Sequence, residues 1–93
     1  MAINTTVIEE FADKLNLTKR DLLMRSRNKT VSKARLILYK LLRDNTNLTY
    51  SDIGLMVNRR YSTVIHGVSS ANSLLNMEDD EAVSMWNMIK DID

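Results

Sequence analysis

The feature that most constrains this chain is an apolar pattern of helical period that no proline interrupts. Apolar residues recur at spacings of three and four along the sequence, and no alternation of apolar and polar residues is long enough to predict a strand. The 93 residues include no proline, so no helix is broken by a missing backbone N–H. A chain of this length builds one hydrophobic core. We therefore expect an all-α fold, a compact helical domain of about six helices that takes in the whole chain.

Polar residues at characteristic spacings predict where the helices begin and end. Three pairs have the spacing of a capping box, namely Thr6 with Glu9, Thr18 with Asp21, and Thr49 with Asp52. Thr30 or Ser32 is expected to open the longest helix, which the polar sequence "DNTN" ends. Asn58 tolerates the left-handed conformation of a helix C-cap. The acidic run "EDDE" predicts an extra C-terminal helix over about residues 78–92.

The chain lacks the residues that several classes of function need. The chain has no cysteine, which excludes disulfides and zinc fingers and makes a cytoplasmic location the simplest expectation. The single histidine, His66, argues against a metal site. No nucleophile has a base partner, no glycine-rich loop could hold a phosphate, and clustered carboxylates occur only in "EDDE". We therefore expect no enzymatic activity, no cofactor and no metal.

No segment predicts insertion into a membrane or export. The longest apolar run, "LILY" at residues 36–39, ends at Lys40 and is too short to span a bilayer. The beginning of the chain lacks the basic start and long apolar run of a signal peptide. We therefore expect no membrane partner.

The charge is concentrated in one segment, although the net charge of the chain is only +1. Residues 18–43 carry nine bases and one acid, Asp21, whereas residues 77–93 carry six acids and one base, Lys90. This asymmetry predicts a polyanion-binding face and an acidic C-terminal helix turned away from it. The alternative is that the nine bases form a solvated face without a ligand.

The sequence "NRRYSTVIHG" at residues 58–67 joins two predicted helices. A very short turn, followed by a helix that begins with basic and hydrogen-bonding side chains, is typical of a helix-turn-helix. In that motif the first turn of the second helix enters the major groove, where arginine reads guanine and hydroxyls contact bases or phosphates. The alternative is that Ser62 and Thr63 only cap the helix while Arg59 and Arg60 are solvated.

Three further residues near this turn indicate where parts of the chain are expected to pack closely together. His66 lies one turn beyond Ser62, where it could contact phosphate, although packing against the first helix is the expectation that we favour. Gly54 and Gly67 lie inside predicted helices, where glycine costs about 1 kcal/mol relative to alanine. Each glycine therefore predicts a close approach of another part of the chain.

Two stretches resemble a known family. The sequences "DLLMRSRNKTVSKARLILYKLLRDNTNLTYSDIG" and "STVIH" are similar to the C-terminal DNA-binding domain of the bacterial replication initiator DnaA, and the similarity covers roughly residues 7–75. It implies a Trp-repressor-like helix-turn-helix with a basic loop, here Arg25 and most closely Arg27, in the minor groove. It also implies that Arg35 meets phosphate and that Ser62 and Thr63 face the major groove. The DNA-binding residues that we expect are Arg25, Arg27, Lys29, Lys33, Arg35, Ser51, Arg59, Arg60, Tyr61, Ser62, Thr63 and His66.

The chain departs from the family at the turn. Where the family has Gly-Gly-Arg-Asp-His before the hydroxyl pair, this chain has the shorter "NRRY", so Arg60 and Tyr61 stand where Asp and His would. An acceptor for cytosine is thereby replaced by a donor that prefers guanine. The resemblance therefore implies a DNA site other than the usual initiator box. No counterpart of the family's ATPase region is present, so we expect a stand-alone domain that does not unwind an origin by itself.

The function that these features favour is sequence-specific binding of double-stranded DNA, in replication control or transcription regulation. We expect the protein to act as a monomer. The alternative is a protein-interaction module whose acidic C-terminal helix binds a replication protein such as the initiator, without reading DNA. The concentration of bases in residues 18–43 and the arginines of the turn favour DNA binding.

Overall fold

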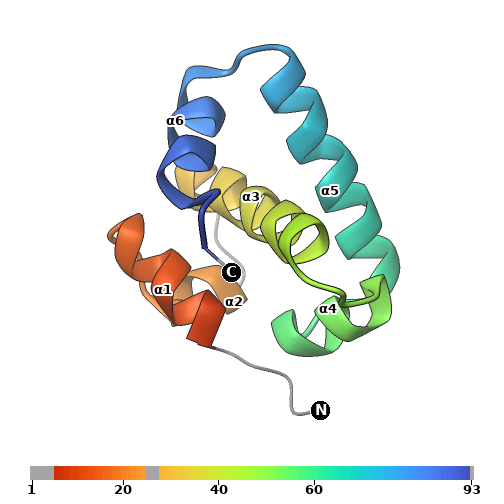
Figure 1. Ribbon diagram of the computed structural model, residues 1–93. Coiled ribbons are helices and arrows are strands. Elements are labelled where there is room, and N and C mark those ends of the chain that lie inside the picture. Colours follow the sequence, from red (N-terminus) through yellow and green to blue (C-terminus); the bar gives the residue numbers. More distant parts are fainter. Residues whose placement is uncertain (1–5, 25–27, 93) are drawn as a thin grey trace.

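The computed structural model describes residues 6–24 and 28–92, and this part of the chain is built from helices without strands. The predicted all-α fold is confirmed. Arg25 and Arg27, predicted to enter the minor groove, lie outside the described residues. The helices are α1 (Thr6–Lys14), α2 (Lys19–Leu23), α3 (Lys29–Asn45), α4 (Tyr50–Val57), α5 (Tyr61–Asn76) and α6 (Asp80–Ile89) (Figure 1). None of them is long and apolar enough to cross a membrane.

The predicted start signals of α2 and α4 are confirmed as complete capping boxes. The hydroxyl of Thr18 accepts a hydrogen bond from the backbone N–H of Asp21 at 3.0 Å, and the carboxylate of Asp21 accepts one from the N–H of Thr18 at 3.0 Å. Thr49 and Asp52 exchange the same pair of bonds at 3.1 Å each. Each box satisfies backbone donors that a helix start otherwise leaves without partners. The pair of Thr6 and Glu9 falls at the edge of the described range.

The start of α3 differs from the prediction. Neither Thr30 nor Ser32 caps this helix; its cap is Asn28, whose Oδ1 accepts from the N–H groups of Thr30 at 2.9 Å and Val31 at 3.2 Å. Asparagine is as good an N-cap as serine, because its short side chain reaches the same two donors. The helix therefore begins at Lys29, and the hydroxyl of Thr30 is left to bind elsewhere.

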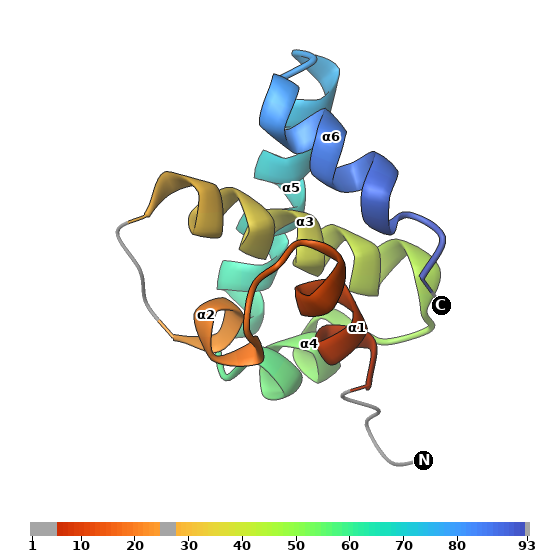
Figure 2. The ribbon, with the colours of Figure 1, turned by 90° about the vertical axis from the view of Figure 1, so that its left-hand side faces the viewer.

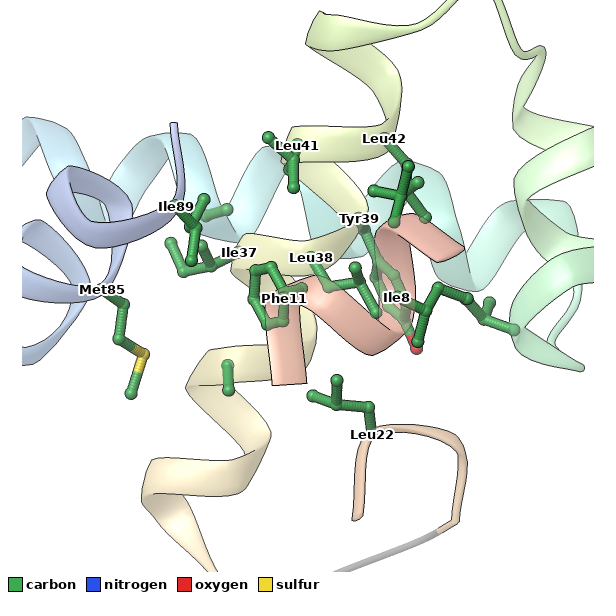
Figure 3. Close-up of a cluster of buried hydrophobic side chains, with 14 of the residues drawn as sticks. Ile8, Phe11, Leu22, Ile37, Leu38, Tyr39, Leu41, Leu42, Met85 and Ile89 are labelled. Carbon is green, nitrogen blue, oxygen red and sulfur yellow. The ribbon is translucent and has the colours of Figure 1, made fainter. Parts of the chain in front are cut away.

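The core forms around α3, which crosses the middle of the molecule with α6 above it and α1, α2 and α4 below it in Figure 2. Figure 3 shows Phe11 of α1, Leu22 of α2 and Ile89 of α6 directed toward Leu38 and its neighbours on α3. All of these side chains are completely or almost completely buried. Helix α3 therefore lies at the centre of the fold, where it packs against α2, α4, α5 and α6.

The acidic start of α6 faces α3, which corrects the expectation of an acidic helix turned away from the basic segment. The ammonium of Lys33 lies 3.0 Å from the carboxylate of Asp79 and 3.1 Å from that of Glu81. The hydroxyl of Thr30 also donates to Glu81 at 2.7 Å. Opposite charges far apart in the sequence thus meet where α6 packs on α3, so part of each charged segment is neutralised within the molecule.

The turn between α4 and α5 is formed by Asn58, Arg59 and Arg60. Asn58 has φ 56° and ψ 50°, the predicted left-handed C-cap conformation. The backbone N–H of Arg59 donates to the carbonyl of Gly54 at 2.9 Å. A Cβ on Gly54 would lie 2.6 Å from the carbonyl oxygen of Arg59. The close approach predicted for this glycine is therefore confirmed, and it brings the turn tightly against α4.

Candidate nucleic-acid interface

The first turn of α5 presents a row of exposed polar side chains. Arg60 is the N-cap residue, and Tyr61, Ser62 and Thr63 follow it as the first helical residues. All four are exposed, and Tyr61 is 59% accessible. The idea that Ser62 and Thr63 serve only as caps is wrong, because they lie inside the helix, beyond the capping position. Their hydroxyls are therefore available to a ligand.

The backbone at this helix start favours an anion. Arg60 provides no side-chain cap, and the first turn contains no acidic residue. The first intrahelical bond runs from the N–H of Val64 to the carbonyl of Arg60 at 3.2 Å. The N–H groups before Val64 have no helical acceptor and carry the positive end of the helix dipole. Together with the neighbouring arginines they make this end of α5 suited to the phosphates of a nucleic acid.

A shallow groove separates α4 from the start of α5. It has a volume of about 470 Å³ and is lined by Gly54, Leu55, Asn58, Arg59, Arg60 and Thr63. Leu55 on α4 is 75% exposed. An apolar side chain beside two guanidiniums could contact a thymine methyl while an arginine binds a neighbouring base. We call this depression the α4–α5 groove.

A second depression lies between α3 and α5, and Arg59 lines this one as well. Its volume is about 490 Å³, and none of the described residues that line it carries a carboxylate. We call it the α3–α5 pocket. Its lining residues are Ser32, Arg35, Leu36, Tyr39, Arg59, Thr63, His66, Gly67 and Ser70.

His66 and Gly67 both line this pocket, but His66 is exposed and Gly67 is buried. The expectation that His66 packs against another helix is wrong, because its side chain is exposed at the pocket. The predicted close approach at Gly67 is confirmed, since a Cβ there would collide with the ring of Tyr39. Gly67 thus lets α5 lie directly on α3, and Thr63, one turn earlier on α5, also lines the α3–α5 pocket.

Arg35 is held beside the pocket by the backbone of α2. Its Nη2 donates to the carbonyl of Asp21 at 3.1 Å, whereas its Nε is buried and has no hydrogen-bond partner among the described residues. Burial is the main cause that lowers the pKa of Arg35 below its ordinary value, and Arg59 acts in the same direction. Burial raises the pKa of Tyr39, while both arginines oppose that change. Arg35 therefore lies in the electric field of Arg59.

The other predicted binding residues are distributed around this surface. Lys29 is exposed at the first position of α3, and Ser51 is exposed in the first turn of α4. Lys33 is instead half-buried, with its ammonium bound by Asp79 and Glu81. It is therefore not a free cation in this structure, which does not support its prediction as a DNA-binding residue.

Sequence reasoning missed the contribution of Tyr39 to the α3–α5 pocket. Tyr39 belongs to the apolar stripe of α3, so its spacing predicts only a core position. A signal was nevertheless present, because Tyr39 follows Arg35 by one helical turn and so shares its face. Which part of α5 covers that face depends on how the two helices cross.

Comparison with known proteins agrees with this geometry. The family described as bacterial DnaA protein helix-turn-helix matches residues 4–70. The chromosomal replication initiator protein DnaA of Ureaplasma parvum is 34% identical over 85 residues, which make up 89% of this chain and 18% of that protein. The protein of the same name from Oleidesulfovibrio alaskensis is 29% identical over 87 residues, which are 90% of this chain and 19% of that protein. This chain thus spans less than a fifth of the length of these relatives. The match over most of its residues, on a fold with the α4–α5 turn and the basic start of α5, shows that the chain belongs to the family of bacterial DnaA helix-turn-helix domains.

Proposed function

We propose that this protein binds double-stranded DNA in a sequence-specific manner, in replication control or in transcription regulation. The observation that carries the proposal is the start of α5, where Arg60, Tyr61 and Ser62 are exposed on a helix end with no acidic residue in its first turn. Membership of the family, and relatives named as chromosomal replication initiators, support a role on DNA.

In this proposal α5 is the recognition helix. It enters the major groove with its first turn, as the second helix of a helix-turn-helix does, while α4 crosses the backbone. Arg60 then meets base edges, where an arginine donates two parallel hydrogen bonds to guanine. Lys29, at the start of α3, and Ser51, in the first turn of α4, are exposed and contact flanking phosphates.

The expected DNA site differs from that of a protein with an acidic residue at the turn. Arg60 offers only donors, and the described part of the turn between α4 and α5 contains no carboxylate. A base that offers acceptors in the major groove suits it best, and guanine offers both O6 and N7. We therefore expect guanine at one or two positions of the site that face the start of α5.

Selection from a pool of random duplexes, followed by sequencing of the bound fraction, tests this proposal. An enriched motif that contains guanine at positions protected by the protein is the expected result. Flat enrichment over several rounds, at a salt concentration where the protein binds DNA, would contradict sequence-specific recognition. Binding to the initiator protein with no enrichment would support the interaction module instead.

The structure offers less support for an interaction module built on the acidic C-terminal helix. Asp79 caps α6 through the N–H of Ala82 at 3.1 Å and also binds Lys33. Glu81 is shared between Lys33 and Thr30. These two carboxylates are therefore already engaged by α3, which leaves them less available to another protein.

A further inference from the structure

We infer that Ile65 on α5 binds the C5 methyl group of a pyrimidine in the major groove, so that the protein distinguishes bases with this methyl from bases without it. The ligand is the methyl group itself, which thymine and 5-methylcytosine both carry. This role rests on the proposed function, because it requires α5 to lie in the groove. Ile65 would then determine specificity at a base other than the one that Arg60 contacts.

Tyr61 and Ile65 are two large side chains that α5 leaves outside the core. They are four positions apart, so they lie one turn apart on the same face of the helix. Tyr61 is 59% exposed and Ile65 is 38% exposed, whereas Val64 and Val68 of the same helix are buried. The first two turns of α5 therefore present apolar surface to the outside of the molecule.

The stability of α5 does not explain an isoleucine at an exposed position. Branching at Cβ lowers the helix propensity of isoleucine, and an unbranched polar side chain would suit both the helix and the solvent better. Single exposed apolar residues are common on protein surfaces. Ile65 differs from that ordinary case because it shares a face with Tyr61, beside the exposed Ser62, where the proposed function places DNA.

The chemistry of the major groove matches this surface. Each base edge offers hydrogen-bonding groups, and the C5 methyl of thymine is the apolar group among them. Arg60 and Ser62 supply hydrogen bonds, whereas Ile65 can supply only an apolar contact. Cytosine acquires the same methyl group when it is methylated at C5. Ile65 therefore suits either base, provided that the methyl is present.

The spacing from Arg60 to Ile65 gives the expected place of the methyl in the DNA site. The two residues are five positions apart, which corresponds to about 7.5 Å along a helix that rises about 1.5 Å per residue. Successive base pairs are about 3.4 Å apart along the duplex. A helix that follows the groove therefore brings Ile65 to a base about two pairs from the guanine that Arg60 contacts.

The first test uses the intact protein and duplexes of the selected sequence in which one thymine at a time is replaced by deoxyuridine. This replacement removes the C5 methyl and keeps the base pair. At the position given by the spacing it should weaken binding of the wild type about fourfold, the effect of losing one buried methyl or methylene group. Ile65→Ala should bind the two duplexes equally, because its contact with the methyl is already lost.

Three variants control for general effects of substitution. Ile65→Val keeps a branched apolar side chain and should keep the dependence on the methyl. Met77→Ala removes a side chain that is 72% exposed at the other end of α5 and should behave like the wild type. Leu55→Ala removes the exposed apolar side chain of the α4–α5 groove, and it should also keep the dependence at this position.

The second test replaces the same thymine by cytosine or by 5-methylcytosine, each paired with guanine. The wild type should bind the 5-methylcytosine duplex about fourfold more tightly than the cytosine duplex, and Ile65→Ala should not distinguish them. A response in both tests shows that the methyl is bound on either base. A response to deoxyuridine alone identifies thymine as the source of the methyl.

The outcomes separate this inference from the proposed function. A wild-type protein that binds no DNA sequence specifically would overturn both. The inference alone is wrong if the wild type selects a motif with guanine but is indifferent to the C5 methyl at every position. It is also wrong if the dependence on the methyl is lost in Leu55→Ala and kept in Ile65→Ala.

Discussion

Gly67 shows how one residue sets the separation between two helices. Because it has no side chain, α5 lies directly against the ring of Tyr39 on α3. Both residues also line the α3–α5 pocket. An alanine at this position would gain about 1 kcal/mol from its higher helix propensity. Its methyl group would, however, clash with the ring of Tyr39.

Gly67→Ala is expected to lower the free energy of unfolding by about 1–3 kcal/mol, the usual cost of adding a methyl group to a packed contact. Urea unfolding followed by circular dichroism measures the change. Asn72→Ala, on an exposed position of α5, is the control and should leave stability nearly unchanged. A Gly67→Ala variant as stable as the wild type would show that the ring of Tyr39 moves aside without cost.

Arg60 is the residue that we expect to carry most of the discrimination between bases. Arg60→Ala should lose about 1–3 kcal/mol of binding free energy on the selected site and much less on random duplexes, because only the specific complex contains the two-pronged bond to guanine. Competition binding to the two DNAs measures the difference. Equal losses on both would assign Arg60 to the phosphate backbone.

At the scale of the elements, α6 is attached to α3 by a charged contact as well as by its apolar stripe. The hydrogen bond from Lys33 is the main cause that lowers the pKa of Asp79, followed by the N–H of Ala82. The hydroxyl of Thr30 and then Lys33 lower the pKa of Glu81. A carboxyl group whose pKa is lower in the folded than in the unfolded state stabilises the fold above its unfolded pKa. That stabilisation is lost as the pH falls through the folded pKa.

Asp79→Asn should therefore reduce the pH dependence of stability in the acid range, below the ordinary pKa of 3.8 for this carboxyl group. Asparagine can still cap α6, so the change removes the charge and keeps the cap. Thermal unfolding of the wild type and the variant between neutral pH and the acid range measures the effect. Curves that run parallel as the pH falls would show that the contact of Asp79 with Lys33 does not stabilise the fold.

Helix termini were predicted well where the signal lies within one turn. The capping boxes of α2 and α4 and the left-handed cap at Asn58 formed as expected. The start of α3 was misplaced because three polar residues, Asn28, Thr30 and Ser32, compete for the cap within five positions. The sequence alone does not decide which of the three caps the helix. In the structure it is Asn28, whose side chain accepts hydrogen bonds from the free N–H groups of Thr30 and Val31.

At the scale of the whole molecule, the basic segment does not act as one uniform patch. Lys29 is exposed, Arg35 borders the α3–α5 pocket, and Lys33 is bound to α6. Lys40 faces α6 as well, with its ammonium 4.9 Å from the centre of the Trp86 ring. The number of cations that can neutralise DNA is therefore smaller than the number in the sequence.

The dependence of DNA affinity on salt should reflect that smaller number. If about four or five phosphates are neutralised, the log–log slope of affinity against salt concentration is about −4. Lys29→Gln should reduce the magnitude of the slope by about 0.9, whereas Lys33→Gln should leave it unchanged. Titrations at several salt concentrations measure the slopes. Equal effects of the two substitutions would mean that Lys33 leaves Asp79 and Glu81 when DNA binds.

The sequence by itself determined the helices, the short turn between α4 and α5, and the polar residues at the start of α5. Those features depend on spacings of three and four residues and on single caps, which are local and visible in the chain. Only the tertiary structure decided that Lys33 pairs with Asp79, 46 positions away, that His66 is exposed, and that Arg59 shares a pocket with Arg35. These relations depend on how α3 is crossed by α5 and α6. That crossing is set by the packing of the whole core, which no local spacing encodes.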